Sequence, residues 1–246
     1  MFHVTPKPNR NKLLGITYML FGVTSYASVA IIVKVALKQN VDVFTLLAYR
    51  FLFAAIIQWG YYVLTNKAET IPLKSISRVV IVGIIGHAWT SILYFSSLEL
   101  ISTILATIIF ATYPAWTMIF ENFLHGVPFT SGRILGLIAI FIGTAFLIVR
   151  PREALTLDMN LGVVLGLGNA IFLALYLVLS RSQVSQYKTE VLSPYYATSA
   201  LVFFLVIKPP WTLNLLEFPQ IGLIAALHFA FFGGFLGVIL FLKALT

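Results

Sequence analysis

Eight long apolar runs constrain this chain more than any other feature of its sequence. A helix needs about 20 mostly apolar residues to cross a bilayer, and these runs are too long and too uniformly apolar for the alternating strands of a membrane barrel. The sequence therefore predicts an all-α integral membrane protein, a polytopic helical bundle with short connections. The expected spans are residues 14–36, 43–64, 79–97, 101–120, 132–149, 160–180, 191–207 and 220–242.

The composition excludes several other classes of protein. Apolar residues make up 60% of the chain and charged residues only 10%, against about 45–50% and 25% in soluble domains. This balance excludes a cytosolic enzyme, a disordered tail and a nucleic-acid-binding domain. The chain has no cysteine, which excludes disulfides, thiol catalysis and cysteine-ligated metal.

The basic residues indicate an orientation. The tail before the first run carries Lys7, Arg10 and Lys12 and is followed by no clear cleavage site, so we expect it to stay attached. With this tail inside, ten Lys and Arg residues fall on the inner side and four on the outer side. The bias predicts a cytoplasmic N-terminus. We expect a multi-pass integral protein of the cell (plasma) membrane.

An internal repeat is detectable at a shift of 147 residues. Five spans lie within that shift, and an odd number inverts the second copy in the membrane, as in many transporters. We therefore expect two inverted five-helix repeats, residues 1–150 and 151–246, with three of five helices present in the second. A duplication without transport function is the alternative. The aligned pairs are Gly15 with Gly162, Lys34 with Arg181, Gly86 with Gly233, and Tyr94 with Phe241.

Several short motifs resemble a known family. They read Tyr94-Phe-Ser-Ser-Leu-Glu-Leu-Ile-Ser-Thr, Tyr113-Pro114, Phe123-Leu-His-Gly-Val-Pro-Phe-Thr130, Ala174-Leu-Tyr-Leu-Val-Leu-Ser-Arg181 and Ala48-Tyr-Arg-Phe51. Together they resemble the EamA-type members of the drug/metabolite transporter (DMT) superfamily, over essentially the whole chain.

The resemblance implies a secondary transporter. Proteins of this kind export or exchange a small metabolite or drug by alternating access, through a central cavity lined by both copies. The implied partners are a small-molecule substrate and the lipid bilayer. Two features depart from the family: Gly126-Val127 stands where Gly-Glu is common, and eight of ten spans are present. These departures leave open a truncated, transport-inactive chain, a homo-oligomer, or a partner chain that supplies the missing helices.

Polar residues inside the spans are the candidates for substrate contact, because ionisable groups are costly there. Tyr18 and Tyr26 are weaker candidates as aromatic lining. The expected cavity residues are Arg50, His87, Trp89, Tyr113, Glu121, Asn169, Tyr176 and His228.

Each charged candidate also has a structural interpretation. Arg50 either binds an anionic group or links to carbonyls or a headgroup. Lys34 lies near a span end, where we expect it to snorkel to the interface. Glu121 either carries protons in the cavity or pairs with Arg133.

The neutral polar candidates have alternatives too. His87 shares a helix face with Ser91 and either titrates during transport or stays neutral, bonded to a neighbouring helix. His228 has the same two interpretations. Asn169 needs a partner, which is another helix, water or substrate.

Two further patterns concern helix geometry. Three GxxxG spacings, at Gly132/Gly136, Gly162/Gly166 and Gly233/Gly237, predict close helix contacts. Pro114 and Pro194 are each expected to make a bend, with a gating kink as the alternative.

No motif indicates a cofactor, a metal or an enzyme. The chain has no Gly-rich phosphate loop, and its four histidines lack zinc-ligand spacing. A membrane-embedded enzyme is the remaining rival, and it would need clustered Asp, Glu or His. The sequence predicts no such cluster.

Overall fold

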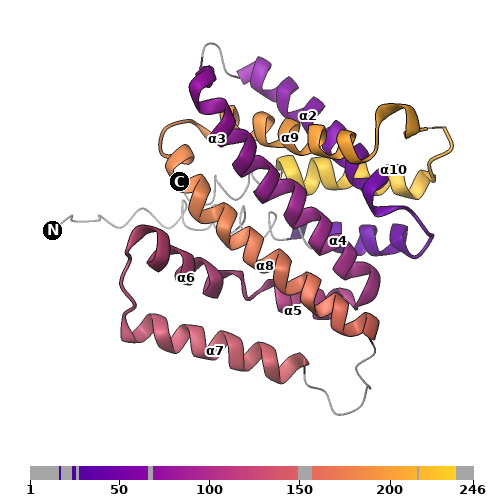
Figure 1. The fold of residues 1–246 in the computed structure, drawn as a ribbon. Coiled ribbons are helices and arrows are strands. Elements are labelled where there is room, and N and C mark those ends of the chain that lie inside the picture. Colours follow the sequence, from indigo (N-terminus) through magenta and orange to yellow (C-terminus); the bar gives the residue numbers. More distant parts are fainter. Residues whose placement is uncertain are drawn as a thin grey trace.

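Every regular element in the described part of the chain is helical (Figure 1). The computed structural model describes residues 17, 24–25, 28–65, 69–148, 157–214 and 216–236. Within them, five helical segments are long and apolar enough to cross a membrane, and Ser28–Leu37, Ser131–Phe146 and Gln220–Leu236 are shorter apolar helices. The prediction of a polytopic helical membrane protein is confirmed.

The helices follow the expected spans closely. Three residues that the sequence analysis singled out lie outside the described residues, namely Tyr18, Tyr26 and Gly237. In chain order after Ser28–Leu37, the elements are α2 (Val43–Thr65), α3 (Leu73–Gly83), π-helical η1 (Ile84–Trp89), α4 (Thr90–Leu100), α5 (Thr103–Phe110), α6 (Tyr113–His125), α7 (Ser131–Ile148), α8 (Leu157–Val184), α9 (Thr189–Ile207), the short η2 (Pro210–Thr212), α10 (Gln220–His228) and π-helical η3 (Phe229–Leu236).

The expected span 101–120 corresponds to the candidate span Thr103–His125, and the two-residue turn of Ala111 and Thr112, called the break below, interrupts it. α5 ends at Phe110, and α6 begins at Tyr113 with Pro114 in its first turn. Proline fits there because it lacks the N–H that a helix interior requires. Pro194, by contrast, lies inside α9, which continues through it.

Glycines allow α8 to approach its neighbours closely. A Cβ on Gly162 would lie 2.6 Å from Ile101 Cγ2, and one on Gly166 would lie 3.2 Å from Ser97 Oγ. Ser97 Oγ also donates a hydrogen bond to the Gly162 carbonyl at 2.8 Å. α8 therefore packs against α4, α5 and α6 and crosses the front of Figure 1. The expected close contact is confirmed for this glycine pair.

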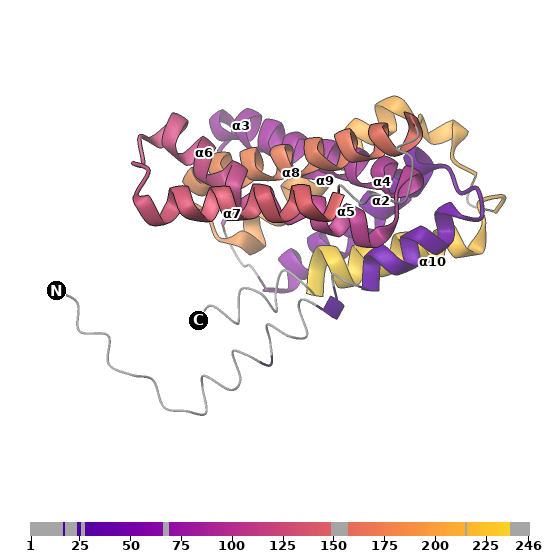
Figure 2. The ribbon, with the colours of Figure 1, turned by 90° about the horizontal axis from the view of Figure 1, so that it is seen from below.

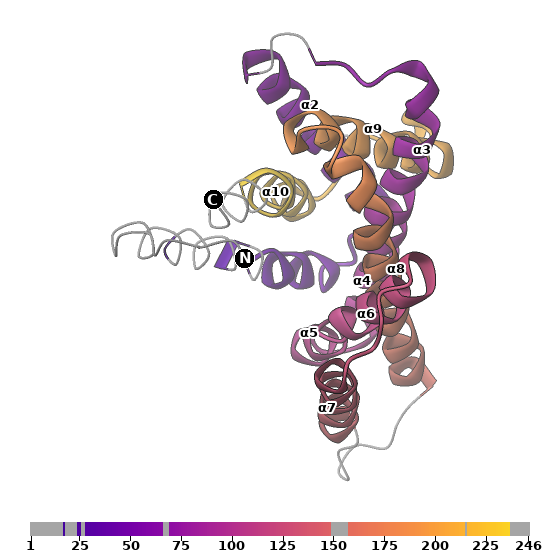
Figure 3. The same cartoon turned by 90° about the vertical axis from the view of Figure 1, so that its left-hand side faces the viewer.

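The other two glycine pairs behave differently. Gly132 and Gly136 on α7 meet no atom within 4 Å, and α7 packs only on α5 and α6 among the larger described contacts. Figures 1 and 3 show α7 at the lower edge of the bundle, and in Figure 2, seen from below, it lies in front of α8. Gly233 lies against Phe229 of its own segment and Val29.

A second group of helices, α2, α9 and α10, forms the rest of the bundle. α2 packs on α9 and α10, and Figure 3 shows these helices on the side opposite α7. The buried rings of Phe51 and Phe204 stack between α2 and α9, with centroids 5.5 Å apart. α4 joins the two groups because it contacts both α2 and α8.

Polar contacts tie the helices together where α2 begins. Lys34 Nζ donates to the carbonyls of Leu98 and Ile101, so it binds the C-terminus of α4 instead of snorkelling as expected. A cation is favourable there because the last carbonyls of a helix carry partial negative charge. Asp42 accepts hydrogen bonds from the backbone N–H and hydroxyl of Thr45 and pairs with Lys208 at 3.2 Å.

Helix boundaries recur at the shift seen in the sequence. α3 begins at Leu73 and α10 at Gln220, which is 147 residues later, and both follow a proline. η1 shifted by 147 falls on residues 231–236, inside η3. α2 and α9 begin 146 residues apart. The division into two inverted repeats stays a proposal, which these boundaries support.

We predict that Gly162→Ala destabilises the protein, because the added methyl meets Ile101 and Leu100. Overpacking of this kind costs about 1–3 kcal/mol. Thermal unfolding of the purified protein in detergent measures the effect. Gly136→Ala is the control, because it enters open space and should be neutral or stabilising through helix propensity. Equal behaviour of the two variants would contradict the packing.

We also predict an acid-sensitive contribution from Asp42. Burial acts to raise its pKa, but the hydrogen bonds from Thr45 and the contact with Lys208 outweigh burial and lower the pKa overall. The charged form therefore stabilises the folded state above the pKa of the unfolded carboxyl, and this stability is lost as the pH falls through the lowered pKa.

Asp42→Asn tests this prediction, because asparagine keeps the ability to cap α2. The variant should melt below wild type at neutral pH, and the difference should disappear as the pH falls through the lowered pKa of Asp42. A difference that does not change with pH would refute an electrostatic origin.

Candidate functional site

Arg50 lies buried in α2 and is surrounded by rings and a hydroxyl. Its Nη1 donates to Ser91 Oγ on α4 at 2.5 Å. Its guanidinium carbon lies 3.4 Å from the ring centroid of Phe229 and 4.2 Å from that of Phe51. Aromatic faces stabilise a cation that has lost its water, which explains how a charged side chain is held inside a span.

His87 lies next to this position, within a group of aromatic rings. Its ring centroid is 5.4 Å from Tyr176, 5.7 Å from Tyr196 and 6.4 Å from Phe51. The two tyrosine rings are 5.9 Å apart in an edge-to-face arrangement. Gly86 makes this possible, because a Cβ at that position would collide with the Tyr176 ring.

A line of hydrogen bonds leads from the rings toward the first turns of α3. The hydroxyl of Tyr196 donates to Gln183 Oε1 at 2.7 Å, and Gln183 Nε2 donates to the carbonyl of Arg78 at 3.1 Å. Tyr196 and Gln183 are both buried. These bonds fix the orientation of the Tyr196 ring beside His87.

These side chains form what we call the Arg50 cluster, supplied by α2, η1, α4, α8, α9 and η3. It combines one positive charge, an imidazole and two phenols with apolar rings, which suits an anionic or hydrogen-bonding group attached to an apolar body. Three expected site residues meet here. The members are Arg50, Phe51, His87, Ser91, Tyr176, Tyr196 and Phe229.

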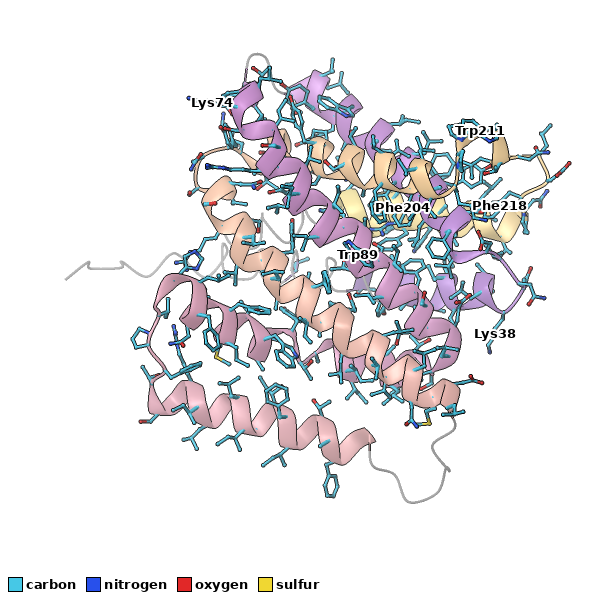
Figure 4. All side chains as sticks on the ribbon, viewed as in Figure 1. Lys38, Lys74, Trp89, Phe204, Trp211 and Phe218 are labelled. Carbon is cyan, nitrogen blue, oxygen red and sulfur yellow. The ribbon has the colours of Figure 1, made fainter. Side chains whose placement is uncertain are left out.

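Trp89 is separated from the cluster. It follows His87 by two residues and therefore points to another side of the helix. Its side chain is 40% exposed and packs on Phe172 and Phe203, with centroids 5.9 and 6.0 Å away. Figure 4 shows it on the face turned to the viewer. We therefore leave Trp89 out of the proposed site.

Tyr113 and Glu121 lie on α6, in other surroundings. The Tyr113 ring contacts Phe110, with centroids 5.4 Å apart. Glu121 pairs with Arg181 of α8 at 3.3 Å, so the salt-bridge partner is not the expected Arg133. The first contact joins the two parts of the broken span, and the second links α6 to α8.

The two remaining expected residues also stand apart. His228 Nε2 lies 2.8 Å from Ser28 Oγ, which corresponds to the helix-linking interpretation. Asn169 is 2% exposed on α8, and its Nδ2 has no hydrogen-bond partner among the described residues.

Three buried polar residues were missed by the sequence interpretation. Tyr196 gave no local signal, because nothing distinguishes it among 11 tyrosines. Gln58 did give one, since it is an amide within an apolar helix like Asn169. Its side chain accepts a hydrogen bond from Ser193 at 2.6 Å and links α2 to α9. Gln183 plays the linking role described above.

No metal site is found where the structure describes the chain, since no group of three His, Cys, Asp or Glu side chains gathers there. The described acidic residues lie near helix ends or in connections.

We predict that Gly86→Ala displaces the Tyr176 ring and lowers thermal stability, because the new methyl occupies the position of that ring. Tyr176→Ala in the same chain should relieve the collision, so the double variant should lose less than the sum of the single losses. Gly60→Ala is the control, because no atom lies within 4 Å of that position. Additive losses would contradict the contact.

Comparison with known proteins gives a family and a fold. No curated protein matches the chain. A solved structure described only as "Crystal structure of protein" is 17% identical with a TM-score of 0.60, and the match covers 97% of this chain and 79% of that one. At this identity the likeness concerns the fold alone. The EamA-like transporter family matches residues 13–149, which is more than half of the chain. The chain therefore belongs to the EamA-like transporter family.

Proposed function

We propose that the chain is a secondary transporter that moves a small metabolite bearing an anionic group, with the Arg50 cluster as its binding site. Transport proceeds by alternating access between two inverted halves, residues 1–150 and 151–246. The cation bias of the connections supports a cytoplasmic N-terminus, and the plasma membrane is the location that we propose.

The depth of Arg50 carries the proposal. It is the eighth residue of α2, so it lies about 10 Å along the helix from its start. The other charged residues of the described long helices lie nearer to a helix end. A charge at such depth costs about 2.5–3.5 kcal/mol on insertion scales and usually marks a substrate path. The potential around it is positive, which favours an anion.

The rings around Arg50 limit the rest of the substrate. Phe51, Phe229 and the two tyrosines offer apolar faces, so an apolar or aromatic body fits beside the anionic group. His87 and the phenols supply hydrogen bonds for orientation. We therefore favour a small organic anion over an inorganic ion.

The origin of the cluster supports alternating access. Arg50, His87 and Ser91 come from the first proposed repeat, while Tyr176, Tyr196 and Phe229 come from the second. A site shared by two inverted copies changes its access when one copy rocks against the other. π-helical segments are often found at functional sites, and η1 and η3 each contribute a residue to the cluster, His87 and Phe229.

Flux through proteoliposomes tests the proposal. The probes are radiolabelled aromatic carboxylates, their uncharged amides and matched amines. We expect flux of at least one carboxylate, with little flux of its amide or amine. Arg50→Gln should lower that flux at least about tenfold, because it removes a buried charge from the site, and Arg50→Lys should retain part of it.

Lys74→Gln is the matched control, because it removes an exposed cation near a helix end (Figure 4). Thermal unfolding of each variant separates loss of binding from loss of folding. Carboxylate flux that survives in a folded Arg50→Gln protein would make Arg50 a structural residue. An absence of flux for every probe by the wild-type chain would count against transport of organic anions.

A further inference from the structure

Asn169 is a buried amide whose donor is not satisfied by the protein. The side chain is 2% exposed, and Nδ2 has no hydrogen-bond partner among the described residues. Leaving a buried amide group unpaired is destabilising, because its hydrogen bonds to water are lost on folding and not replaced. Asn169 precedes Tyr176 by two helical turns and does not belong to the Arg50 cluster. The donor therefore needs a partner of its own.

The packing of α8 places Asn169 level with the break between α5 and α6. Near its start, Gly166 of α8 packs against Ile109 of α5. Near its end, Arg181 pairs with Glu121 of α6. α8 therefore runs in the same direction as the broken span. Asn169 lies one turn beyond Gly166 on the same face of α8. Ala111 and Thr112 lie a similar distance beyond Ile109, so Asn169 is level with them. Figure 1 shows α8 passing the junction of α5 and α6.

The break supplies an acceptor. Pro114 has no N–H, so the carbonyl of Phe110, four residues earlier, receives no helical hydrogen bond. Thr112 is fully buried at the junction, and its hydroxyl donates a hydrogen bond to the carbonyl of Ile109 at 2.7 Å. Thr112 therefore does not serve the Phe110 carbonyl with that proton. The register of α8 against α5 therefore puts a buried donor and a carbonyl without a helical hydrogen bond at the same level of the bundle.

We propose that a water molecule is bound here, between Asn169 and the break in the span. It accepts a hydrogen bond from Asn169 Nδ2 and donates one to the Phe110 carbonyl, and so satisfies both groups. A metal cation satisfies only acceptors and would leave the amide N–H unpaired. Buried waters typically occupy such polar sites, and the freed backbone groups of broken membrane helices are often satisfied by ordered water.

The bound water gives the break a mechanical role. Water that inserts into the hydrogen-bond ladder of a helix allows a bend at that point. α6 then turns on α5 without exposing an unpaired carbonyl to lipid. The Arg181–Glu121 pair, at the far end of α6, holds the bent half against α8.

Asn169→Leu tests the proposal through the sign of its effect on stability. In a dry site, leucine replaces an unpaired amide by an apolar side chain of similar size, and the melting temperature should rise. In a hydrated site, the variant loses the bridge and strands the Phe110 carbonyl. We expect the purified chain to melt about 2–4 °C lower than wild type. Asn214→Leu, in an exposed connection, is the control and should not change.

Radiolytic hydroxyl labelling with mass spectrometry gives a second measurement. Bound water generates radicals in place, so Tyr113, beside the break, should be labelled in wild type and several-fold less in Asn169→Leu. Phe204, which is fully buried elsewhere, should be labelled in neither. A raised melting temperature, or unchanged labelling of Tyr113, overturns the proposal. A melting temperature that rises with sodium but not with choline, and only when Asn169 is present, also overturns it in favour of a cation.

Discussion

Close contact between helices in a bilayer has to come from small residues and polar bonds, because lipid is as apolar as the side chains it would replace. In the group of helices around α8, close contact comes from glycines and from one polar bond. Gly162 and Gly166 bring its backbone against α4 and α5, and Ser97 adds a hydrogen bond to the Gly162 carbonyl. The position of Tyr176 and Asn169 depends on this contact, since both project from α8.

The same constraint explains the placement of the buried polar side chains. Lys34 joins the first helix to the end of α4, Gln58 joins α2 to α9, and Gln183 joins α8 to α3. Each is a residue type that is costly in lipid unless it has a partner. Arg50 differs because it meets aromatic faces and Ser91 where the two halves come together. That setting suits a substrate site better than a structural link.

The membrane-spanning character of the chain was predictable because it depends on apolar length alone. The expected spans recur as helices, and the family resemblance is confirmed over residues 13–149. Candidate residues were less predictable. Arg50, His87 and Tyr176 do meet, yet Trp89 and His228 lie elsewhere, although all five were candidates for the same cavity. Rarity identifies a residue that needs a partner, and it does not identify that partner.

The break at Pro114 illustrates the same limit. A proline in an apolar run predicts some disturbance, but it does not by itself give the residues at which α5 ends and α6 begins. Glu121 was expected to bond Arg133, twelve residues away along the chain, and instead meets Arg181 on α8. Contacts between distant segments depend on packing angles that local patterns do not encode.

The sequence by itself determined that this chain is a helical membrane protein with a basic bias between its two sides, because hydropathy and charge act on each segment separately. It also indicated which side chains are expensive in lipid. Only the tertiary structure decided that the Arg50 guanidinium lies over the rings of Phe51 and Phe229, and that the amide of Asn169 is buried without a partner among the described residues. These arrangements arise because helix packing rotates each face toward a particular neighbour, and that rotation depends on the whole bundle.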